Sequence, residues 1–228
     1  MDRYRRWGGW IWLGLGLVLL PVAGLLGWPM PGVITWALTA VLLALAVVIA
    51  ARPGGGAARV SAKLTALLLA VDLAAAVADR FGIFGGPGEP GVSWGNWTQF
   101  TDYTAVLLHH PSPVLVQTAA VGATAAEVVL AVLLASGRRR RLVGKATAGL
   151  FFVYTAALVL GPEHATVVRY GMPFLIGAAL VLSATPAAGS VRQTEGGNDK
   201  TRSRHVRHDD GRSGEAAGQG RARATPEG

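Results

Sequence analysis

The chain has 228 residues, 51% of them hydrophobic, and no cysteine. The lack of cysteine excludes disulfides, thiol redox catalysis, thiolate-held iron–sulfur clusters and cysteine-type zinc sites. A net charge of +8 would suggest a nucleic-acid partner in a soluble protein, but several apolar runs of about 18 residues lack a central Lys or Arg and predict transmembrane helices. The basic residues lie mostly in the loops between these runs, so membrane topology explains most of the charge and no nucleic-acid partner is expected.

The first 52 residues predict an N-terminal transmembrane hairpin. Its first apolar run covers 11–28, the turn 29–32 contains two prolines, and the second run covers 33–51. A basic start before an apolar run is also typical of a signal peptide, but this run continues past the usual length and no clear A-x-A cleavage site follows it. We therefore expect the run to remain as a membrane span with Trp residues at both interfaces.

The third run, 64–81, combines a stripe of small residues with two acidic ones. Asp72 and Asp79 are seven residues apart and therefore share one helix face. A carboxylate at the depth of Asp72 is costly unless it is protonated, paired or facing a polar cavity. Alanine recurs at every fourth position, which favours close helix contact, at Ala66, Ala70, Ala74 and Ala78.

The fourth run, 114–135, carries a polar stripe. Gln117 and Thr124 are seven residues apart and Glu127 follows three later, so the three side chains face the same side of the helix. The loop after this run holds the densest basic cluster in the chain. This cluster consists of Arg138, Arg139, Arg140, Arg141 and Lys145. Its simplest role is to fix the membrane topology, and contact with anionic lipid headgroups is a second role.

Two more apolar runs and a polar tail complete the chain. A fifth span is predicted over 146–160 and a sixth over 168–184. From 187 to 228, apolar residues nearly vanish, which predicts a disordered basic tail. The expected fold is therefore an all-α integral membrane bundle of six transmembrane helices.

The distribution of Lys and Arg predicts the orientation of this bundle. Three lie at the N-terminus, three in the 52–63 loop, five in the 137–145 loop and eight in the tail, together 19 of the 21. The intervening loops hold none, apart from Arg80 and Arg169 at the adjoining helix ends. By the positive-inside rule both termini are expected to be cytoplasmic.

The connector 81–103, part of the long loop 81–113, differs from the other loops. Its glycines and prolines exclude a continuous helix. Its Trp, Phe and Tyr residues are the opposite of what a flexible linker contains. The charge pattern makes the connector extracytoplasmic, and we expect an ordered cap at the bilayer interface.

The connector and its flanks resemble the DoxX family of small bacterial membrane proteins. The resemblance is carried by AAVADRFGIFGGPGEPGVSWGNW at 75–97, followed by Phe100, Tyr103-Thr104 and AEVVLAV at 126–132. It covers about residues 60–184, which implies the four-helix unit of that family, with the 1–52 hairpin as an addition. Two elements depart from the family pattern: RYGMP at 169–173 replaces a Tyr-Ser pair, and the Asn expected after the Tyr-Thr element is missing.

The resemblance implies a subunit of, or accessory to, a quinone-linked redox complex in the bacterial cytoplasmic membrane. Quinone is then the implied cofactor, partner redox subunits and membrane lipids are the implied partners, and any enzymatic role is that of a component of a quinone-linked oxidoreductase. Two alternatives stay open. One is a small-solute or proton-coupled permease, although no internal repeat is visible. The other is a non-catalytic membrane adaptor, and either form is compatible with an oligomer.

Four ionisable residues form the leading site candidate, with two competing interpretations. In the functional one, a carboxylate that holds a proton relays it to a quinone headgroup beneath the aromatic cap. In the structural one, two of the residues lie at the interface and the other two lock helices together by hydrogen bonds. Opposed carboxylates would keep one proton between them. The four residues are Asp72, Asp79, Arg80 and Glu127.

Further candidates are aromatic residues and histidines on the outer side. The aromatic group consists of Trp94, Trp97, Phe100 and Tyr103. These residues could line a quinone or lipid pocket, but an interfacial aromatic belt is the favoured alternative. The second group consists of His109, His110, Glu163 and His164. Their spacing matches no known set of metal ligands, so no metal site is predicted. Gly14 and Gly16 lie within a span and indicate helix packing, not a dinucleotide site.

Overall fold

The structure is a computed structural model that describes residues 2–109 and 111–185, with side chains from residue 7 onward. It divides into two units, 1–187 and 188–228. The predicted tail and His110 lie outside the described residues, and everything below concerns the first unit. Within the described residues all regular structure is helical, which agrees with the predicted class.

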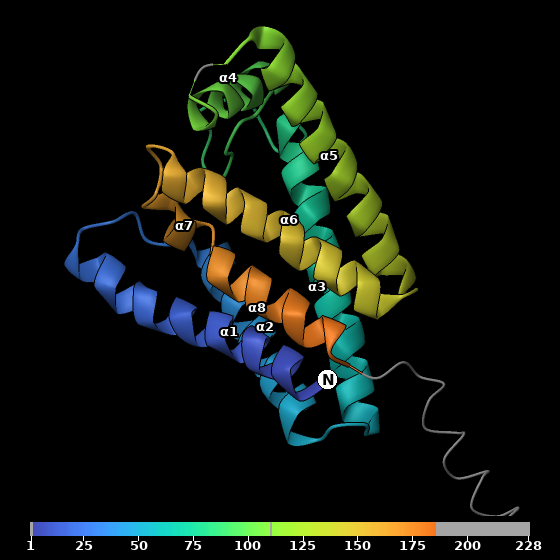
Figure 1. The fold of residues 1–228 in the computed structure, drawn as a ribbon. Helices are drawn as coiled ribbons and strands as arrows, with labels where there is room; N and C mark the ends of the chain where they lie inside the picture. Colours follow the sequence, from blue (N-terminus) through green and yellow to red (C-terminus); the bar gives the residue numbers. More distant parts are fainter. Residues whose placement is uncertain (1, 110, 186–228) are drawn as a thin grey trace, which may run out of the picture. The chain divides into compact units, whose positions relative to one another are not determined.

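The helices follow one another along the chain without strands in the part that the structure describes (Figure 1). Their bounds are α1 Asp2–Leu25, α2 Val33–Ala51, α3 Gly56–Arg80, α4 Trp97–Leu107, α5 Pro113–Ser136, α6 Arg140–Leu160, α7 Thr166–Arg169 and α8 Met172–Ser183.

Five of these helices, α1, α2, α3, α5 and α6, are long and apolar enough to cross a membrane. This agrees with a multi-pass membrane protein. Their ends follow local sequence signals, as α5 illustrates. Pro113 occupies its first turn, where a missing N–H costs nothing, and Gly137 ends it with a φ of 65°.

The last apolar run differs from the single span expected over 168–184. Gly171 has a φ of 64° and separates the short helix α7 from α8. Such a left-handed residue cannot continue a helix, and Pro173 begins the next one. At 1.5 Å per residue the twelve residues of α8 span about 18 Å, less than the hydrocarbon thickness of a bilayer of about 30 Å.

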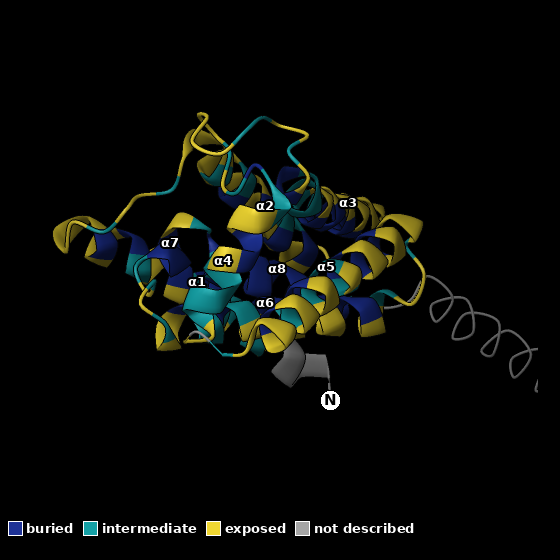
Figure 2. Ribbon diagram, turned by 90° about the horizontal axis from the view of Figure 1, so that it is seen from above, coloured by how far each residue is buried: buried dark blue, intermediate teal, exposed yellow. Residues whose placement is uncertain are grey.

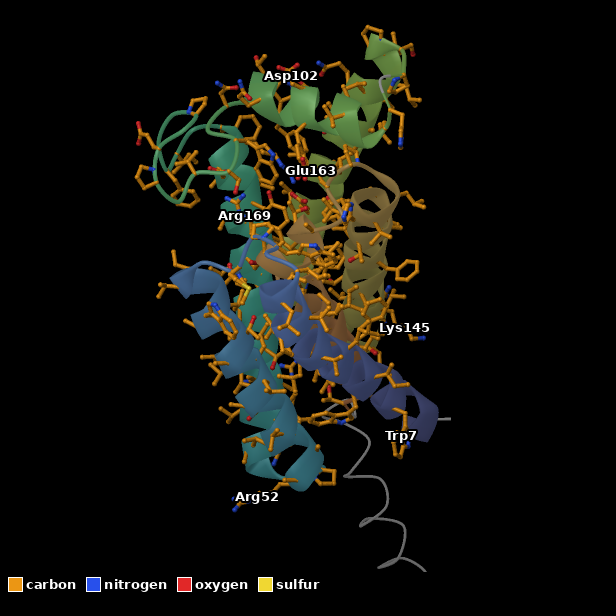
Figure 3. All side chains as sticks on the ribbon, turned by 90° about the vertical axis from the view of Figure 1, so that its left-hand side faces the viewer. Trp7, Arg52, Asp102, Lys145, Glu163 and Arg169 are labelled. Atoms are coloured by element: carbon orange, nitrogen blue, oxygen red, sulfur yellow. The ribbon has the colours of Figure 1, made fainter. Side chains whose placement is uncertain are left out.

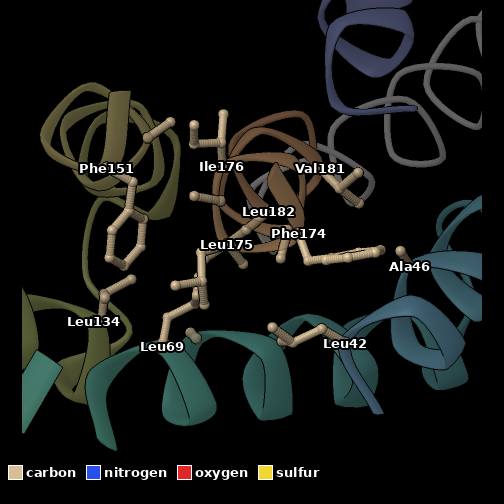
Figure 4. Close-up of a cluster of buried hydrophobic side chains, with 14 of the residues drawn as sticks. Leu42, Ala46, Leu69, Leu134, Phe151, Phe174, Leu175, Ile176, Val181 and Leu182 are labelled. Atoms are coloured by element: carbon tan, nitrogen blue, oxygen red, sulfur yellow. The ribbon is translucent and has the colours of Figure 1, made fainter. Parts of the chain in front are cut away.

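Helix α8 is the buried centre of the bundle (Figure 2). It contacts α1, α2, α3, α6 and α7, and nearly all of its side chains are buried. A helix that is apolar on every side is buried in a protein core or in lipid, and α8 is surrounded by other helices. Figure 4 shows α8 side chains meeting those of its neighbours: Leu42, Ala46, Leu69, Leu134, Phe151, Phe174, Leu175, Ile176, Val181 and Leu182.

Glycines allow α1 to approach α8 closely. A Cβ on Gly16 would lie 2.7 Å from the Phe174 ring, and one on Gly177 would lie 2.7 Å from Leu13 Cγ. Gly14 faces open space. The packing role expected for this glycine pair therefore belongs to Gly16, and the N-terminal hairpin is an integral part of the bundle.

Only part of the small-residue stripe of α3 is buried in helix contacts. Ala66 and Ala70 are buried, whereas Ala74 is exposed. The buried face of α3 alternates these alanines with larger residues such as Leu69 and Leu73, and it packs against α2 and α5.

Two of the basic turns lie below the acidic residues of the connector side in Figure 3. Figure 3 places Arg52 and Lys145 in its lower half, with Asp102 and Glu163 in its upper half. Arg169 also lies in the upper half. The connector between α3 and α5 therefore lies at the end away from the basic turns.

The connector is ordered and contains a helix that was not predicted. Helix α4 begins after Asn96, whose side-chain oxygen accepts a hydrogen bond from the Gln99 N–H at 2.8 Å, a typical N-cap. Gly82 and Gly95 meet closely, because a Cβ on Gly82 would lie 2.7 Å from the Gly95 carbonyl oxygen. The glycine-rich half of the connector thus folds back on itself, and α4 contacts α3, α5 and α6.

Candidate functional site

The site is organised around a buried ion pair between the end of α3 and the middle of α5. Arg80 and Glu127 are only 2% and 1% exposed. Arg80 Nη2 donates to Glu127 Oε1 at 2.7 Å, and Nη1 lies 2.7 Å from Oε2. Glu127 Oε2 is thus in charge contact with Arg80 Nη1 but accepts no well-aligned hydrogen bond among the described residues. The two-point geometry is the one that guanidinium and carboxylate groups favour.

Two further side chains complete the network around this pair. Arg80 Nη1 donates to the Thr124 hydroxyl at 2.7 Å, one turn before Glu127 on α5. The Tyr154 hydroxyl of α6 donates to Glu127 Oε1 at 2.5 Å. Glu127 therefore links α3, α5 and α6, and its Oε1 accepts the hydrogen bond of the Tyr154 phenol.

Aromatic side chains of the connector cover the guanidinium. The Arg80 carbon Cζ lies 3.9 Å from the centroid of the Phe100 ring and 5.3 Å from that of Trp94. The two rings meet edge to face at 5.3 Å. A cation over aromatic faces is attracted by the ring quadrupole, more strongly when water is excluded. The connector is thus attached to the ion pair and not merely placed above it.

Asp79 attaches the connector to α3 at a second point. Its Oδ2 accepts hydrogen bonds from the backbone N–H groups of Ser93 and Trp94, at 3.1 and 3.0 Å. Its Oδ1 is buried without a partner among the described residues. Two consecutive residues at the end of α3 therefore bind different elements: Asp79 binds the connector, and Arg80 binds α5.

We expect Asp79→Ala to release the connector. The variant loses two hydrogen bonds to a charged acceptor, each worth about 1.5–3 kcal/mol. The amides of Ser93 and Trp94 should therefore exchange with solvent deuterium at least about tenfold faster. Asp102→Ala is the matched control, because Asp102 is an exposed carboxylate on α4. Equal exchange in both variants would mean that Asp79 does not hold the connector.

Trp97 packs against the Phe100 ring, with ring centroids 5.6 Å apart, on the way to the exposed edge of the connector. Its ring stacks on that of Phe81 at 5.8 Å with an interplanar angle of 14°, and Phe81 is 61% exposed. Trp97 Nε1 donates to Gln117 Oε1 at 3.4 Å. Gln117, the outermost residue of the polar stripe on α5, thus contacts the cap, whereas Thr124 and Glu127 contact Arg80.

Tyr103 forms a separate polar group where α4 meets the α7–α8 junction. Burial, and then the neighbouring Tyr170, raise the pKa of the Tyr103 hydroxyl, so it stays protonated. This hydroxyl is buried without a well-aligned hydrogen bond among the described residues, although Thr166 lies nearby. The Tyr103 ring also lies 6.4 Å from that of Trp94.

Asp72 is half-buried on α3, close enough to Glu127 for the two carboxylates to interact electrostatically. The structure thus brings Arg80, Glu127 and Asp72 together, and it links Asp79 to the same site through the connector.

The described members of the histidine group, His109, Glu163 and His164, form no such cluster. His164 packs edge to face against Trp28 at 5.7 Å. Across residues 2–109 and 111–185, no group of three His, Cys, Asp or Glu side chains is placed to hold a metal ion.

Sequence reasoning did not include Tyr154 among the site residues, nor the direct pairing of Arg80 with Glu127. Tyr154 is a single hydroxyl in an apolar helix, and periodicity does not show that it faces α5. The available signal for the pairing was charge balance, because Arg80 is a cation at the end of one apolar span and Glu127 is an acidic residue within another.

Comparison with known proteins adds no assignment. No protein-family model, no curated protein and no solved structure matches the chain.

Proposed function

We propose that this protein is a DoxX-like integral membrane subunit of, or accessory to, a quinone-linked redox complex in the bacterial cytoplasmic membrane. The observation that carries the proposal is the Arg80–Glu127–Tyr154 network beneath the connector. Ionisable residues within a membrane bundle are costly and mark proton or ligand sites more often than they serve packing. The sequence resemblance over 60–184 points the same way.

The proposed topology has six spans, with α7 and α8 together as the last, and both termini in the cytoplasm. The basic turns at Arg52 and Lys145, away from the connector, support this orientation (Figure 3). The connector then faces the extracytoplasmic side.

The residues fit a quinone headgroup at the cap. Among the described residues the buried Arg80 Nε has no hydrogen-bond partner, and quinone carbonyl oxygens accept hydrogen bonds from such N–H groups. Trp94 is only half-buried beside the guanidinium, so part of its indole ring is accessible to a planar group. A bound quinone supplies a couple that exchanges two electrons and two protons.

The chain's own residues would manage protons and charge at this site. Arg80 pairs with the Glu127 carboxylate, and the Tyr154 hydroxyl donates a hydrogen bond to Glu127 Oε1. Asp72 supplies a second carboxylate on the membrane-interior side of this network. Phe100 and Trp94 exclude water from the guanidinium.

We expect Glu127→Gln to lower quinol-dependent electron transfer in membranes at least about tenfold, because a positioned proton-transfer group contributes about 10²–10⁴. The control is Thr118→Val, an exposed residue on the same helix. The full chain should also copurify with quinone, measured by extraction and chromatography. Unchanged electron transfer in Glu127→Gln, with no quinone in the purified protein, would refute the proposal.

A second candidate, a proton-coupled or small-solute permease, is favoured by the break at Gly171 between α7 and α8. Transporters commonly bind their substrates at interrupted helices. Solute uptake into proteoliposomes, driven by a proton gradient and absent from Glu127→Gln, would favour this function over the first.

A further inference from the structure

The turn between α5 and α6 presents a dense positive charge at the end of the bundle away from the connector. Arg138, Arg139 and Lys145 are exposed. Within the described residues no salt bridge is recorded for any of them. From Val128 to Pro162 the sequence contains no acidic residue, so these charges have no local counterpart.

The remaining acidic groups do not compensate for this charge. Glu127, the nearest acidic residue before the turn, is paired with Arg80. The segment 187–228 holds six Asp and Glu residues but eight Lys and Arg residues, so it has no net negative charge to offer. Among the described residues, Arg138, Arg139 and Lys145 therefore have no acidic side chain that neutralises their charge.

The backbone fixes the turn in one conformation. Gly137 and Arg139 both have left-handed backbone geometry, with φ of 65° and 47°. This geometry is unfavourable for a residue with a side chain and persists only where the surroundings hold it. Gly144 holds the following helix against α8, since a Cβ there would lie 2.9 Å from the Ala179 carbonyl oxygen. The turn thus presents its cations from a rigid base.

Exposed apolar side chains adjoin the turn on both helices. Val132 in the last turns of α5 is 63% exposed, and Leu142 in the first turn of α6 is 61% exposed. Both helices are long and apolar enough to cross a membrane, so the turn between them lies at the level of the lipid headgroups. The cations complement the phosphate-bearing headgroup of a phospholipid, and the exposed aliphatic side chains complement its acyl chains.

We propose that the α5–α6 turn is a binding site for an anionic phospholipid. Arg138, Arg139 and Lys145 contact the phosphate-bearing headgroup, and Val132 and Leu142 contact the acyl chains. Charge complementarity selects this occupant, because an anionic headgroup gains from each nearby Lys or Arg while a zwitterionic one gains little. The inference is independent of the proposed redox function.

The test compares the binding of phosphatidylglycerol and phosphatidylcholine to the full-length chain in detergent by native mass spectrometry. We expect the triple variant R138Q/R139Q/K145Q to bind phosphatidylglycerol at least about tenfold more weakly. Phosphatidylcholine binding should not change. The matched control is R52Q/R59Q/K63Q, which removes three exposed cations from the α2–α3 turn and the start of α3. Thermal unfolding of both variants verifies that each is folded.

A large loss in the α5–α6 variant with a small loss in the control supports a defined site. Equal losses in both variants would show only a general attraction to the basic end and would overturn the proposal. An absence of loss would overturn it as well.

Discussion

Arg80→Met is expected to destabilise the bundle by about 3–5 kcal/mol, the cost of leaving a buried charge without its partner. The change leaves the Glu127 carboxylate buried at 1% exposure, with Tyr154 as its remaining close donor. It also removes the cation from the Phe100 and Trp94 faces. Unfolding in mixed detergent, followed by circular dichroism, measures the loss.

The double variant R80M/E127M distinguishes a structural role of the pair from a functional one. Replacing both charges by apolar groups of similar size removes the desolvation cost along with the attraction, so stability should return close to that of the original protein. If the pair serves only to lock α3 to α5, membrane redox activity should return too. Under the proposed function, activity stays low while the fold is restored.

Arg169→Met is the control for Arg80→Met, because Arg169 is an exposed arginine at the same end of the bundle as the connector. Its replacement should change stability by less than about 1 kcal/mol, the usual contribution of an exposed charge. A comparable loss from Arg169→Met and Arg80→Met would contradict the central role given to the buried pair.

The second large effect is expected from Gly177→Ala on α8. The added Cβ would lie 2.7 Å from Leu13 Cγ and 3.0 Å from the Gly9 carbonyl oxygen. Such overpacking typically costs about 1–3 kcal/mol. Because the backbone of α1 cannot move aside as a flexible side chain would, we expect the upper part of this range, measured by the same unfolding assay.

Gly14→Ala on α1 is the matched control. Nothing lies within 4 Å of the position of its Cβ, so the variant should gain about 0.5–1 kcal/mol from the higher helix propensity of alanine. A double-mutant cycle between Gly177→Ala and Leu13→Ala should show that the Gly177→Ala cost falls when Leu13 is shortened. If the two substitutions are additive, α1 and α8 are not in the close contact described.

The apolar pattern predicted the helices well, because a helix that faces lipid must be apolar over its whole length. The bounds expected for 33–51 match α2, and those for 114–135 differ from α5 by one residue at each end. Helices α3 and α6 begin at Gly56 and Arg140, well before the expected starts at 64 and 146, because polar and basic residues continue these helices beyond the apolar run. The same reasoning expected one span over 168–184, where the structure has α7, a left-handed Gly171 and α8. Hydropathy averages over such a break and does not detect it.

The sequence by itself determined that the chain is helical, that it contains several helices able to cross a membrane, and which polar residues share a face. Gln117, Thr124 and Glu127 were placed on one stripe by their spacing alone, because a helix fixes the angle between its own side chains. What lies opposite that stripe depends on other helices. Only the tertiary structure placed Arg80 against Glu127, brought Tyr154 to the same carboxylate and closed Trp94 and Phe100 over the guanidinium. The angles and distances between separate helices are set by the packing of their side chains and by buried contacts such as those of Gly16 and Gly177.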